Sequence, residues 1–377
     1  MATPLHVTRR ALYVVALISI LVAAAYVGVA SARGQATGMA TPPIRSTGPH
    51  GEKAYPATKV NLTPAQLKKV KSLHATAAIA LHYGGNDWST AQVDGLKYEF
   101  KKLGIKVIGV TDAHFEANTQ VSDIQTLMTK KPDIIVSIPV DPVATASAYK
   151  KAAKAGIKLV FMDNVPNGFV AGKDYISDVS ADNYGNGVVS AQLLAKAIHG
   201  KGTIGLIYHE ADFFVTHQRY LGFKNTIEKY PGIKIVAEKG VPGPNFPSQA
   251  EAAATAILTR YPTLTAMWGV WDVPATGILS AARATGHPNL VVATEDLGLD
   301  DAVPLAQKQM ICCIGSQRPF DQGIAEAKLG AYGLIGKKAP PYVAVPALPV
   351  SHANVLQAWQ TVYHAPAPAS LKKAWKK

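Results

Sequence analysis

The segment Ala77-Ala78-Ile79-Ala80-Leu81-His82, followed by Tyr83-Gly84-Gly85-Asn86-Asp87-Trp88, decides the fold class of this 377-residue chain. Its first half is apolar without alternation, which is typical of a strand covered on both faces in a parallel α/β sheet. Its second half is a loop with two glycines, an amide, a carboxylate and an indole, and we expect a helix to begin at Ser89. Ligands of open parallel sheets bind beyond the carboxyl ends of the strands, so this loop is a candidate for holding a small polar molecule.

The remainder of the chain repeats this alternation of strand and helix. The further strands are predicted at 105–110, 133–138, 157–162, 203–208, 233–238, 266–270, 290–293 and 310–314. Helices are predicted at 89–103, 119–129, 142–155, 184–198, 216–229, 248–260, 273–285, near 300–307, and at 319–335 and 351–363. The pattern predicts an α/β protein with two similar lobes, each a parallel sheet with helices on both faces, joined by a hinge.

The boundaries of the lobes follow from where the chain is expected to cross between them. We place the crossovers near Ala181, Gln317 and Val345. The N-terminal lobe would then hold 75–180 and 318–345, and the C-terminal lobe 181–317 and 346–363. Residues 33–74 are predicted as a flexible spacer with one short helix, which Thr63 caps and Pro64 begins. The basic tail 364–377 is expected to be mobile.

The first thirty-two residues have the composition of an export segment. Arg9-Arg10 precede an apolar run over 11–29, and Ala30-Ser31-Ala32 fits a cleavage site for small residues. The run is also long enough to stay as a membrane anchor. Thr8-Arg9-Arg10 resembles the start of a twin-arginine signal, but no Phe-Leu follows it. Residues 1–32 are therefore predicted as a signal peptide or a retained anchor, and the rest of the chain is expected to be exported from the cytoplasm.

The distribution of charge argues against a nucleic-acid-binding protein, and the positions of the cysteines argue against a protein stabilised by a disulfide. The formal net charge is +13, but Lys and Arg are scattered over predicted helix faces and form no basic stripe with interleaved aromatic residues, so no nucleic-acid partner is expected. The only cysteines, Cys312 and Cys313, are adjacent. Their Cα atoms lie about 3.8 Å apart across a trans peptide, below the usual disulfide range of about 4.4–6.8 Å. We expect two small residues on a buried strand and no structural cross-link.

Motifs for enzymatic and cofactor chemistry are missing from the sequence. It contains no GxxxxGK[ST], no GxGxxG after a strand, no GxSxG, no HExxH and no paired-cysteine metal spacing. His209-Glu210 and His217 flank one loop and could form a metal or acid–base set, although surface histidines are commoner than such sets. We therefore predict no catalysis, no cofactor and no metal.

Polar and aromatic residues instead gather where predicted strands end. They are Asn86 and Trp88, Asp163-Asn164, Trp271-Asp272, Glu295-Asp296 and Ser316-Gln317. Each alone could equally be a helix cap or a turn residue. Together they suit a sugar or polyol, because carboxylates accept from hydroxyl groups, amides and guanidinium groups donate to oxygen, and aromatic faces cover C–H groups.

Several segments carry a resemblance to a known family. They are Asn86-Asp87-Trp88, 134–139 with Asp141, 159–163, Ala181-Asp182-Asn183, Gln218-Arg219-Tyr220-Leu221-Gly222-Phe223, Val270-Trp271-Asp272, Ala293-Thr294-Glu295-Asp296 and Ser316-Gln317-Arg318-Pro319. With them the chain resembles the type I periplasmic substrate-binding proteins of ribose-type ABC sugar importers, over roughly 76–363. The resemblance implies a monomer that closes on a sugar or polyol and passes it to a membrane permease. A receptor that feeds a membrane sensor is the alternative.

The resemblance also implies a set of ligand-binding residues. By this resemblance Asn86 supplies an amide and Trp88 an aromatic wall. Asp163 and Arg219 bind hydroxyl groups, and Asp296 and Gln317 complete the cleft. Asn164 stands where the ribose pattern has Arg, Trp271 where it has Asn, and His82, Ser89 and Ile138 also depart from it. We add His82, Asn164 and Trp271 to the predicted ligand-binding residues. Compared with the ribose pattern, the site then has one guanidinium group fewer and one indole more. A less hydroxylated sugar, a polyol or a modified sugar therefore fits better than ribose. Trp268 is expected in the core.

Overall fold

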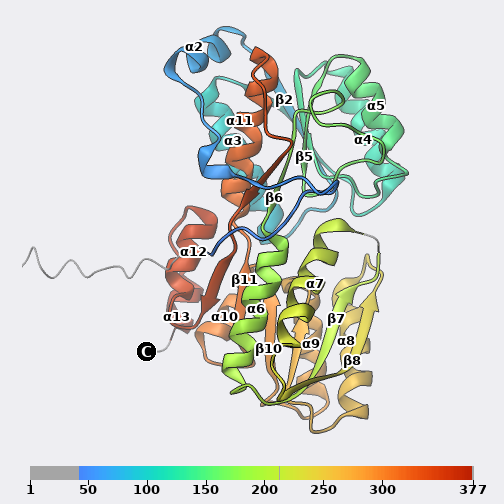
Figure 1. The fold of residues 1–377 in the computed structure, drawn as a ribbon, viewed down its shortest axis with the longest axis vertical. Coiled ribbons are helices and arrows are strands. Elements are labelled where there is room, and N and C mark those ends of the chain that lie inside the picture. The colour runs from blue at the N-terminus through green and yellow to red at the C-terminus, as the bar shows by residue number, and fades with distance from the viewer. Residues whose placement is uncertain (1–41, 212, 376–377) are drawn as a thin grey trace, which may run out of the picture. The chain divides into compact units, whose positions relative to one another are not determined.

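The computed structural model describes residues 42–211 and 213–375, and the predicted export segment 1–32 lies outside the described residues. The described strands form two sheets, with orders β1-β12-β6-β5-β4-β2-β3 and β13-β11-β10-β9-β7-β8 (Figure 1). The first contains β1 (Tyr55–Pro56), β2 (Thr76–Leu81), β3 (Lys106–Asp112), β4 (Ile134–Ser137), β5 (Lys158–Met162), β6 (Ser177–Ala181) and β12 (Tyr342–Val345). The second contains β7 (Gly202–His209), β8 (Ile233–Val241), β9 (Ala266–Gly269), β10 (Val291–Glu295), β11 (Ile311–Ser316) and β13 (Leu348–Ser351).

Except for α13, which was not predicted, the helices correspond to the predicted ones, with shifts of a few residues at their ends. They are α2 (Pro64–Ser72), α3 (Asp87–Leu103), α4 (Ala117–Thr129), α5 (Ala146–Lys154), α6 (Asn183–Ala197), α7 (Phe214–Ile227), α8 (Phe246–Arg260), α9 (Asp272–Ala284), α10 (Leu299–Ala306), α11 (Pro319–Ile335), α12 (Val355–Tyr363) and α13 (Ala369–Ala374). A single 3-10 turn, η1 (Ala57–Lys59), precedes α2.

Strand β2 has the environment that its sequence predicts. Residues 77–81 are all buried, and β2 pairs in parallel with β3 on one side and β4 on the other. Its side chains alternate between two hydrophobic clusters, with Ile79 facing α3 and α11 and Ala78 facing α4 and α5. Figure 1 shows these helix pairs on opposite sides of the sheet. Burial on both faces explains why the strand is apolar throughout.

The chain passes three times between the sheets. It leaves the first sheet after β6, which ends at Ala181, and it returns from β11 through α11, which packs against α3. It crosses again between β12 and β13, over 346–347. Strand β13 pairs antiparallel with β11, so the second sheet is parallel except at this edge.

Four strands, β1, β6, β12 and β13, were not expected. Strand β6 has the sequence Ser-Asp-Val-Ser-Ala, and its polar side chains are buried together with Val179. Strands β12 and β13 are four residues long and adjoin prolines, which hides them in the sequence. Residues 351–354 therefore form the end of β13 and a turn, where the sequence predicted the start of a helix.

The prediction of a flexible spacer is wrong for its described part. Strand β1 pairs in parallel with β12. Ser46 donates its backbone amide and its hydroxyl to Asp182 Oδ1, both at 2.8 Å, and Gln218 Nε2 donates to the carbonyl oxygen of Thr47. These contacts attach 42–59 to the folded body. Thr63 and Pro64 do begin a helix, as predicted, with a capping box that Gln66 completes.

The prediction of a mobile tail is also wrong for 364–375. Helix α13 buries Leu371, and Trp375 Nε1 donates to the carbonyl oxygen of His352 at 3.1 Å. The rings of Trp375 and His352 are stacked 5.7 Å apart. The apolar residues between the lysines therefore dock the tail, as one side of an amphipathic helix would.

Within 42–211 and 213–375, no helix is long and apolar enough to cross a membrane. The apolar run at 11–29 lies outside the described residues. Cys313 is buried in β11 and Cys312 is partly exposed, and both thiols are free.

Candidate functional site

A cavity of about 520 Å³ lies where the carboxyl ends of the parallel strands of the two sheets meet. This volume includes space open to solvent; the part that the centre of a water molecule can reach is about 60 Å³, several times the about 10–15 Å³ that one water molecule needs. Its walls come from the segments that follow β2, β3, β4, β5, β7, β9, β10 and β11. The lining residues are His82, Tyr83, Asn86, Trp88, Phe115, Ile138, Asp163, His209, Phe213, Val215, Thr216, Arg219, Trp271, Asp272, Asp296 and Gln317.

The first wall is built by the loop after β2 and the start of α3. Asn86 caps this helix, since its side chain accepts a hydrogen bond from the backbone amide of Ser89 at 2.8 Å. Trp88 follows within the first turn and is buried, and its Nε1 has no hydrogen-bond partner among the described residues. Asn86 therefore serves as a helix cap and as part of the cavity lining at the same time.

The two sheets, each with its helices, form two halves of the folded body. Aromatic rings from both halves meet around the cavity. His82 stacks on Phe213 with ring centroids 5.7 Å apart and an interplanar angle of 16°. Phe115 contacts Phe246 edge to face at 5.4 Å, and Phe246 contacts Trp271 at 4.7 Å. These contacts join residues that follow β2 and β3 to residues of the second half of the site.

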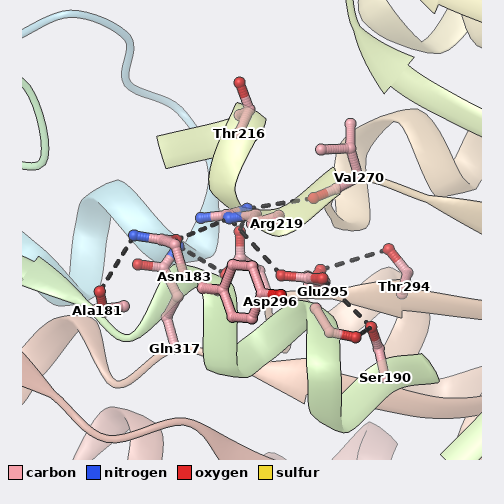
Figure 2. Close-up of polar contacts among 12 residues, drawn as sticks. Ala181, Asn183, Ser190, Thr216, Arg219, Val270, Thr294, Glu295, Asp296 and Gln317 are labelled. Atoms are coloured by element: carbon pink, nitrogen blue, oxygen red, sulfur yellow. Dashed lines mark hydrogen bonds and ion pairs between the residues drawn. The ribbon is translucent and has the colours of Figure 1, made fainter. Parts of the chain in front are cut away.

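The polar floor of the second half is organised around Arg219 on α7 (Figure 2). Its Nη1 donates to Asp296 Oδ2 at 3.0 Å and to the carbonyl oxygen of Val270 at 3.3 Å. Its Nε donates to Asn183 Oδ1 at 2.9 Å and lies 3.7 Å from Glu295 Oε2. The second oxygen of Asp296, Oδ1, accepts from Gln317 Nε2 at 2.8 Å. Arg219 is thus held in place by charged and neutral acceptors together.

Close packing of α6 on α7 positions this arginine. A Cβ atom on Gly187 of α6 would lie 2.2 Å from the carbonyl oxygen of Arg219. A Cβ atom on Gly222 of α7 would lie 2.2 Å from the carbonyl oxygen of Tyr184. Only glycine permits this approach, which brings the backbone of Arg219 against α6. The glycine-rich start of α6 is therefore a packing feature.

Asp163 occupies the corresponding place at the end of β5. It accepts a hydrogen bond from the Ser180 hydroxyl at 2.6 Å and one from Gln322 Nε2 at 3.5 Å. Burial, opposed in part by the Ser180 hydrogen bond, raises the pKa of Asp163 to about 6. Asp163 and Asp296 have φ values of 62° and 65°, so both hold the left-handed backbone conformation that is sparsely populated outside glycine.

The two histidines of the cavity are neutral at physiological pH. Burial, together with the nearby His209, lowers the pKa of His82 to about 3. Burial, together with the charge of Arg219, lowers the pKa of His209 to about 4. His209 Nδ1 lies 3.1 Å from the Thr216 hydroxyl, whereas His82 Nδ1 has no partner among the described residues.

Two further carboxyl groups belong to the site: Asp272 lines the cavity, and Glu295 lies behind the lining. Burial raises the pKa of Asp272 well above its ordinary value, and the neighbouring Asp296 raises it further. Burial also raises the pKa of Glu295, whose Oε1 accepts from the Ser190 hydroxyl at 3.2 Å. The site therefore contains more acidic groups than basic ones.

The structure places most of the residues that the sequence singled out around one cavity. The residues that line it are His82, Asn86, Trp88, Asp163, Arg219, Trp271, Asp296 and Gln317. Asn164 is buried but is not part of the lining. Trp268 lies in the core, as predicted, stacked on Phe223 at 4.7 Å.

Sequence reasoning missed several apolar members of the lining. Phe115 follows β3, and Phe213 and Val215 follow β7. The rule that found Asn86 and Asp163, attention to the residues just after each strand, also covers Phe115 and Phe213. Phe115 and Phe213 have no hydrogen-bonding side chain, however, so a search for polar residues and tryptophans does not select them. Tyr83, His209 and Thr216 also line the cavity, although none of them was predicted to bind the ligand.

A hydrogen bond outside the cavity also joins the two halves. Asp87, in the first turn of α3, accepts from the backbone amide of Leu299 at 2.7 Å. Leu299 begins α10 in the second half, where helix amide groups have no partners within the helix. The contact holds the loop after β2 against the opposite half.

Known proteins with similar sequences and folds bear directly on this site. Over 224 residues the chain is 27% identical to a D-ribose/D-allose-binding protein of Pseudomonas aeruginosa, covering 59% of this chain and 67% of that protein. It is 23% identical over 273 residues to a ribose import binding protein of Bacillus subtilis, covering 72% and 85%. Its fold matches an Agrobacterium vitis ABC transporter solute-binding protein crystallised with α-D-tagatopyranose, with a TM-score of 0.69, 23% identity and coverage of 78% and 100%.

A family model agrees with these likenesses. The model described as periplasmic binding protein domain matches residues 77–338. The matched span includes both sheets except β1, β12 and β13, and every residue that lines the cavity. The fold is thus that of the type I periplasmic binding proteins, and the chain belongs to the periplasmic binding protein domain family.

Proposed function

We propose that the chain binds a sugar or a polyol in the cavity between the two sheets and delivers it to the permease of an ABC importer. The observation that carries this proposal is the combination, at the ends of eight parallel strands, of a guanidinium–carboxylate floor with aromatic walls. The relatives support it, because one is named for ribose and allose and another for ribose import.

Each kind of lining residue has a role that suits hydroxylated ligands. Asp163 and Asp296 accept hydrogen bonds from hydroxyl groups, and Arg219 and Asn86 donate to ligand oxygen atoms. Trp88 and Trp271 cover the C–H faces of the ligand. Asn164 does not line the cavity, so the proposal gives it no direct contact with the ligand. No reaction on the ligand is part of the proposal, because the family binds solutes.

The proposal includes location and assembly. The protein acts as an exported monomer in the periplasm, in keeping with its family. The contacts of His82 with Phe213 and of Asp87 with Leu299 join the two halves and would stabilise a closed, ligand-holding form. Hinge motion between such halves is a common way to release a ligand.

A thermal-shift and calorimetry screen tests this function. The probes are D-ribose, D-allose and myo-inositol, with L-leucine and L-glutamate as another ligand class. A ligand at 100 times its Kd adds about 2.7 kcal/mol of stability, so a true ligand raises Tm by several degrees. Loss of affinity in Asp163→Ala by about 1.5–3 kcal/mol, the range for a hydrogen bond to a charged group, would place the ligand in the cavity.

Two matched substitutions separate binding in the cavity from binding elsewhere. Val215 lines the cavity and is buried, so Val215→Trp fills it. Val170 is 55% exposed and lies outside the cavity, so Val170→Trp is the control. The proposal predicts that only the first abolishes the shift. If an amino acid stabilises the protein and none of the hydroxylated probes does, the proposed ligand class is wrong.

A further inference from the structure

We propose that the ligand is an amino-substituted sugar or polyol, bound as a cation with its ammonium group beside Asp163. This inference rests on the proposed function and narrows it. It comes from the balance of charge around the cavity, from polar atoms in its wall that lack partners, and from its aromatic surface.

The cavity lining contains three carboxyl groups and one permanently charged base. The acids are Asp163, Asp272 and Asp296, and the base is Arg219. No lysine belongs to the lining formed by the described residues. Glu295 lies directly behind, 3.7 Å from Arg219 Nε, so the same guanidinium group faces a fourth acid.

The guanidinium group of Arg219 makes its hydrogen bonds with residues of the second half of the site. Its hydrogen bonds go to Asp296, Asn183 and the carbonyl oxygen of Val270. Asp163 instead receives hydrogen bonds from the neutral Ser180 and Gln322. Among the described ion pairs, Asp163 is in none, and burial raises its pKa although the more distant charge of Arg219 opposes the shift. A charge buried without a counter-ion is costly, so a cationic ligand would remove a cost that a neutral one leaves in place.

The histidines cannot supply the missing positive charge. Their pKa values, lowered to about 3 for His82 and about 4 for His209, keep both rings neutral. A neutral imidazole can accept a hydrogen bond. His82 Nδ1 is more than nine-tenths buried, lines the cavity and has no partner among the described residues.

Gln317 adds a second acceptor of the same kind. Its Nε2 donates to Asp296, which leaves Oε1 as an acceptor without a partner among the described residues. The wall thus offers His82 Nδ1, Gln317 Oε1 and the carboxylate of Asp163 to donors on the ligand. An ammonium group has three such donors, whereas a hydroxyl group has one. Trp88 Nε1 would donate to a ligand oxygen.

The aromatic part of the lining also favours a cation. Tyr83, Trp88, Phe115, Phe213 and Trp271 all line the cavity. Aromatic faces attract a cation, and most strongly where water is excluded. The same rings can stack on a neutral sugar, so the charge balance is what distinguishes the two classes of ligand.

Calorimetry on matched pairs of compounds tests this inference. The pairs are D-glucose with D-glucosamine, D-galactose with D-galactosamine, and myo-inositol with an amino-deoxy-inositol. The N-acetylated amino sugars serve as uncharged controls that keep the nitrogen. In the best-binding pair at pH 7.5, we expect the amine to bind at least tenfold more tightly than its hydroxyl partner, and N-acetylation to remove this preference.

Substitution of the acid assigns the preference to one residue. Asp163→Asn keeps the size of the side chain and should reduce the preference for the amine to less than threefold. Asp94→Asn, on an exposed position of α3, is the control and should leave it unchanged. If Asp163→Asn does not fold, the comparison of the amine with its N-acetylated form in the unchanged protein decides the question alone.

The possible results separate the inference from the function on which it rests. If a neutral sugar or polyol binds as tightly as its amine, the inference is wrong and the proposed function stands. If no member of any pair binds while an amino acid does, both are wrong. A preference for the amine that survives in Asp163→Asn contradicts the assignment to Asp163.

Discussion

Asp163 and Asp296 occupy equivalent places in the two halves of the molecule and have opposite surroundings. Each follows a buried parallel strand, holds a positive φ and lines the same cavity. Asp296 is paired with Arg219 at 3.0 Å and with Gln317 at 2.8 Å. Asp163 has a hydroxyl donor at 2.6 Å and a weak amide contact at 3.5 Å.

The difference shows how one protein can divide a binding task between similar halves. The second half brings its own counter-ion and is organised before the ligand arrives. The first half presents a buried carboxyl group that no cation of the described chain contacts, and under our proposal a ligand would supply part of the missing positive charge. Because only the first half lacks a counter-ion, a positively charged group of the ligand would bind there, and this would favour a single orientation of the ligand.

The largest expected effect comes from removing the counter-ion of the second half. Arg219→Met should lower the free energy of unfolding by about 3–5 kcal/mol, because it leaves Asp296 and Glu295 buried without a cation. Urea denaturation measures this loss. Lys224→Met is the control, since the Lys224–Glu238 pair is more exposed and should contribute about 1 kcal/mol or less. Equal losses in the two variants would show that Arg219 is not the organising charge.

The second-largest expected effect is a change in the free energy of unfolding that has opposite signs for Asp163 and Asp296. Asp163→Asn should raise the free energy of unfolding by about 3 kcal/mol at pH 7.5 at most, because a pKa of about 6 against 3.8 means that the folded protein holds the charged form at a cost of about 1.4 kcal/mol per unit. Asp296→Asn should lower it, because Arg219 loses its partner. Denaturation of both variants at pH 7.5 measures the signs, and the same sign in both would contradict the comparison.

The same carboxyl group predicts a dependence on pH. The folded pKa of Asp163 is raised, so its contribution to stability increases as pH falls from about 6 towards 4 and is lost as pH rises through 6. Arg219 opposes this shift and Asp296 increases it. Asp178 and Glu326 interact with Asp163 as further acids nearby. The difference in stability between wild type and Asp163→Asn should therefore shrink from pH 7.5 to pH 4.5.

His82 is expected to have a smaller effect on stability, with a pH dependence opposite to that of Asp163. Its folded pKa of about 3 lies below the ordinary value of 6.5, so stability is lost as pH falls below 6.5. His82→Phe keeps an aromatic ring next to Phe213 and removes the proton. Between pH 8 and pH 5 the variant should lose about 2 kcal/mol less stability than wild type, as followed by denaturation with His209 unchanged. An identical loss would show that His82 is accessible to protons in the folded state.

The sequence predicted the fold well and the cavity in part, for reasons that individual residues make clear. Apolar strands such as β2 and capped helices such as α3 carry local signals, so they were found. Strand β6 was missed because Asp178 and two serines are buried in it by partners distant in sequence. Asp163 was found because it ends an apolar strand, whereas Phe115 and Phe213 carry no polar signal. The pairing of Arg219 with Asp296, and its absence at Asp163, depends on helix packing that no local pattern reveals.

The most direct measurement is the pKa of Asp163 itself. Carboxyl carbon-13 NMR of the ligand-free protein, with the signal assigned by comparison with Asp163→Asn, follows the ionisation of this group. The account predicts a midpoint near pH 6 without ligand, because burial outweighs the hydrogen bond from Ser180 and the charge of Arg219, and a fall of the midpoint when a cationic ligand from the matched pairs is added. A midpoint near 4 without ligand would show that the protein already compensates this charge, and it would contradict the division of roles between Asp163 and Asp296.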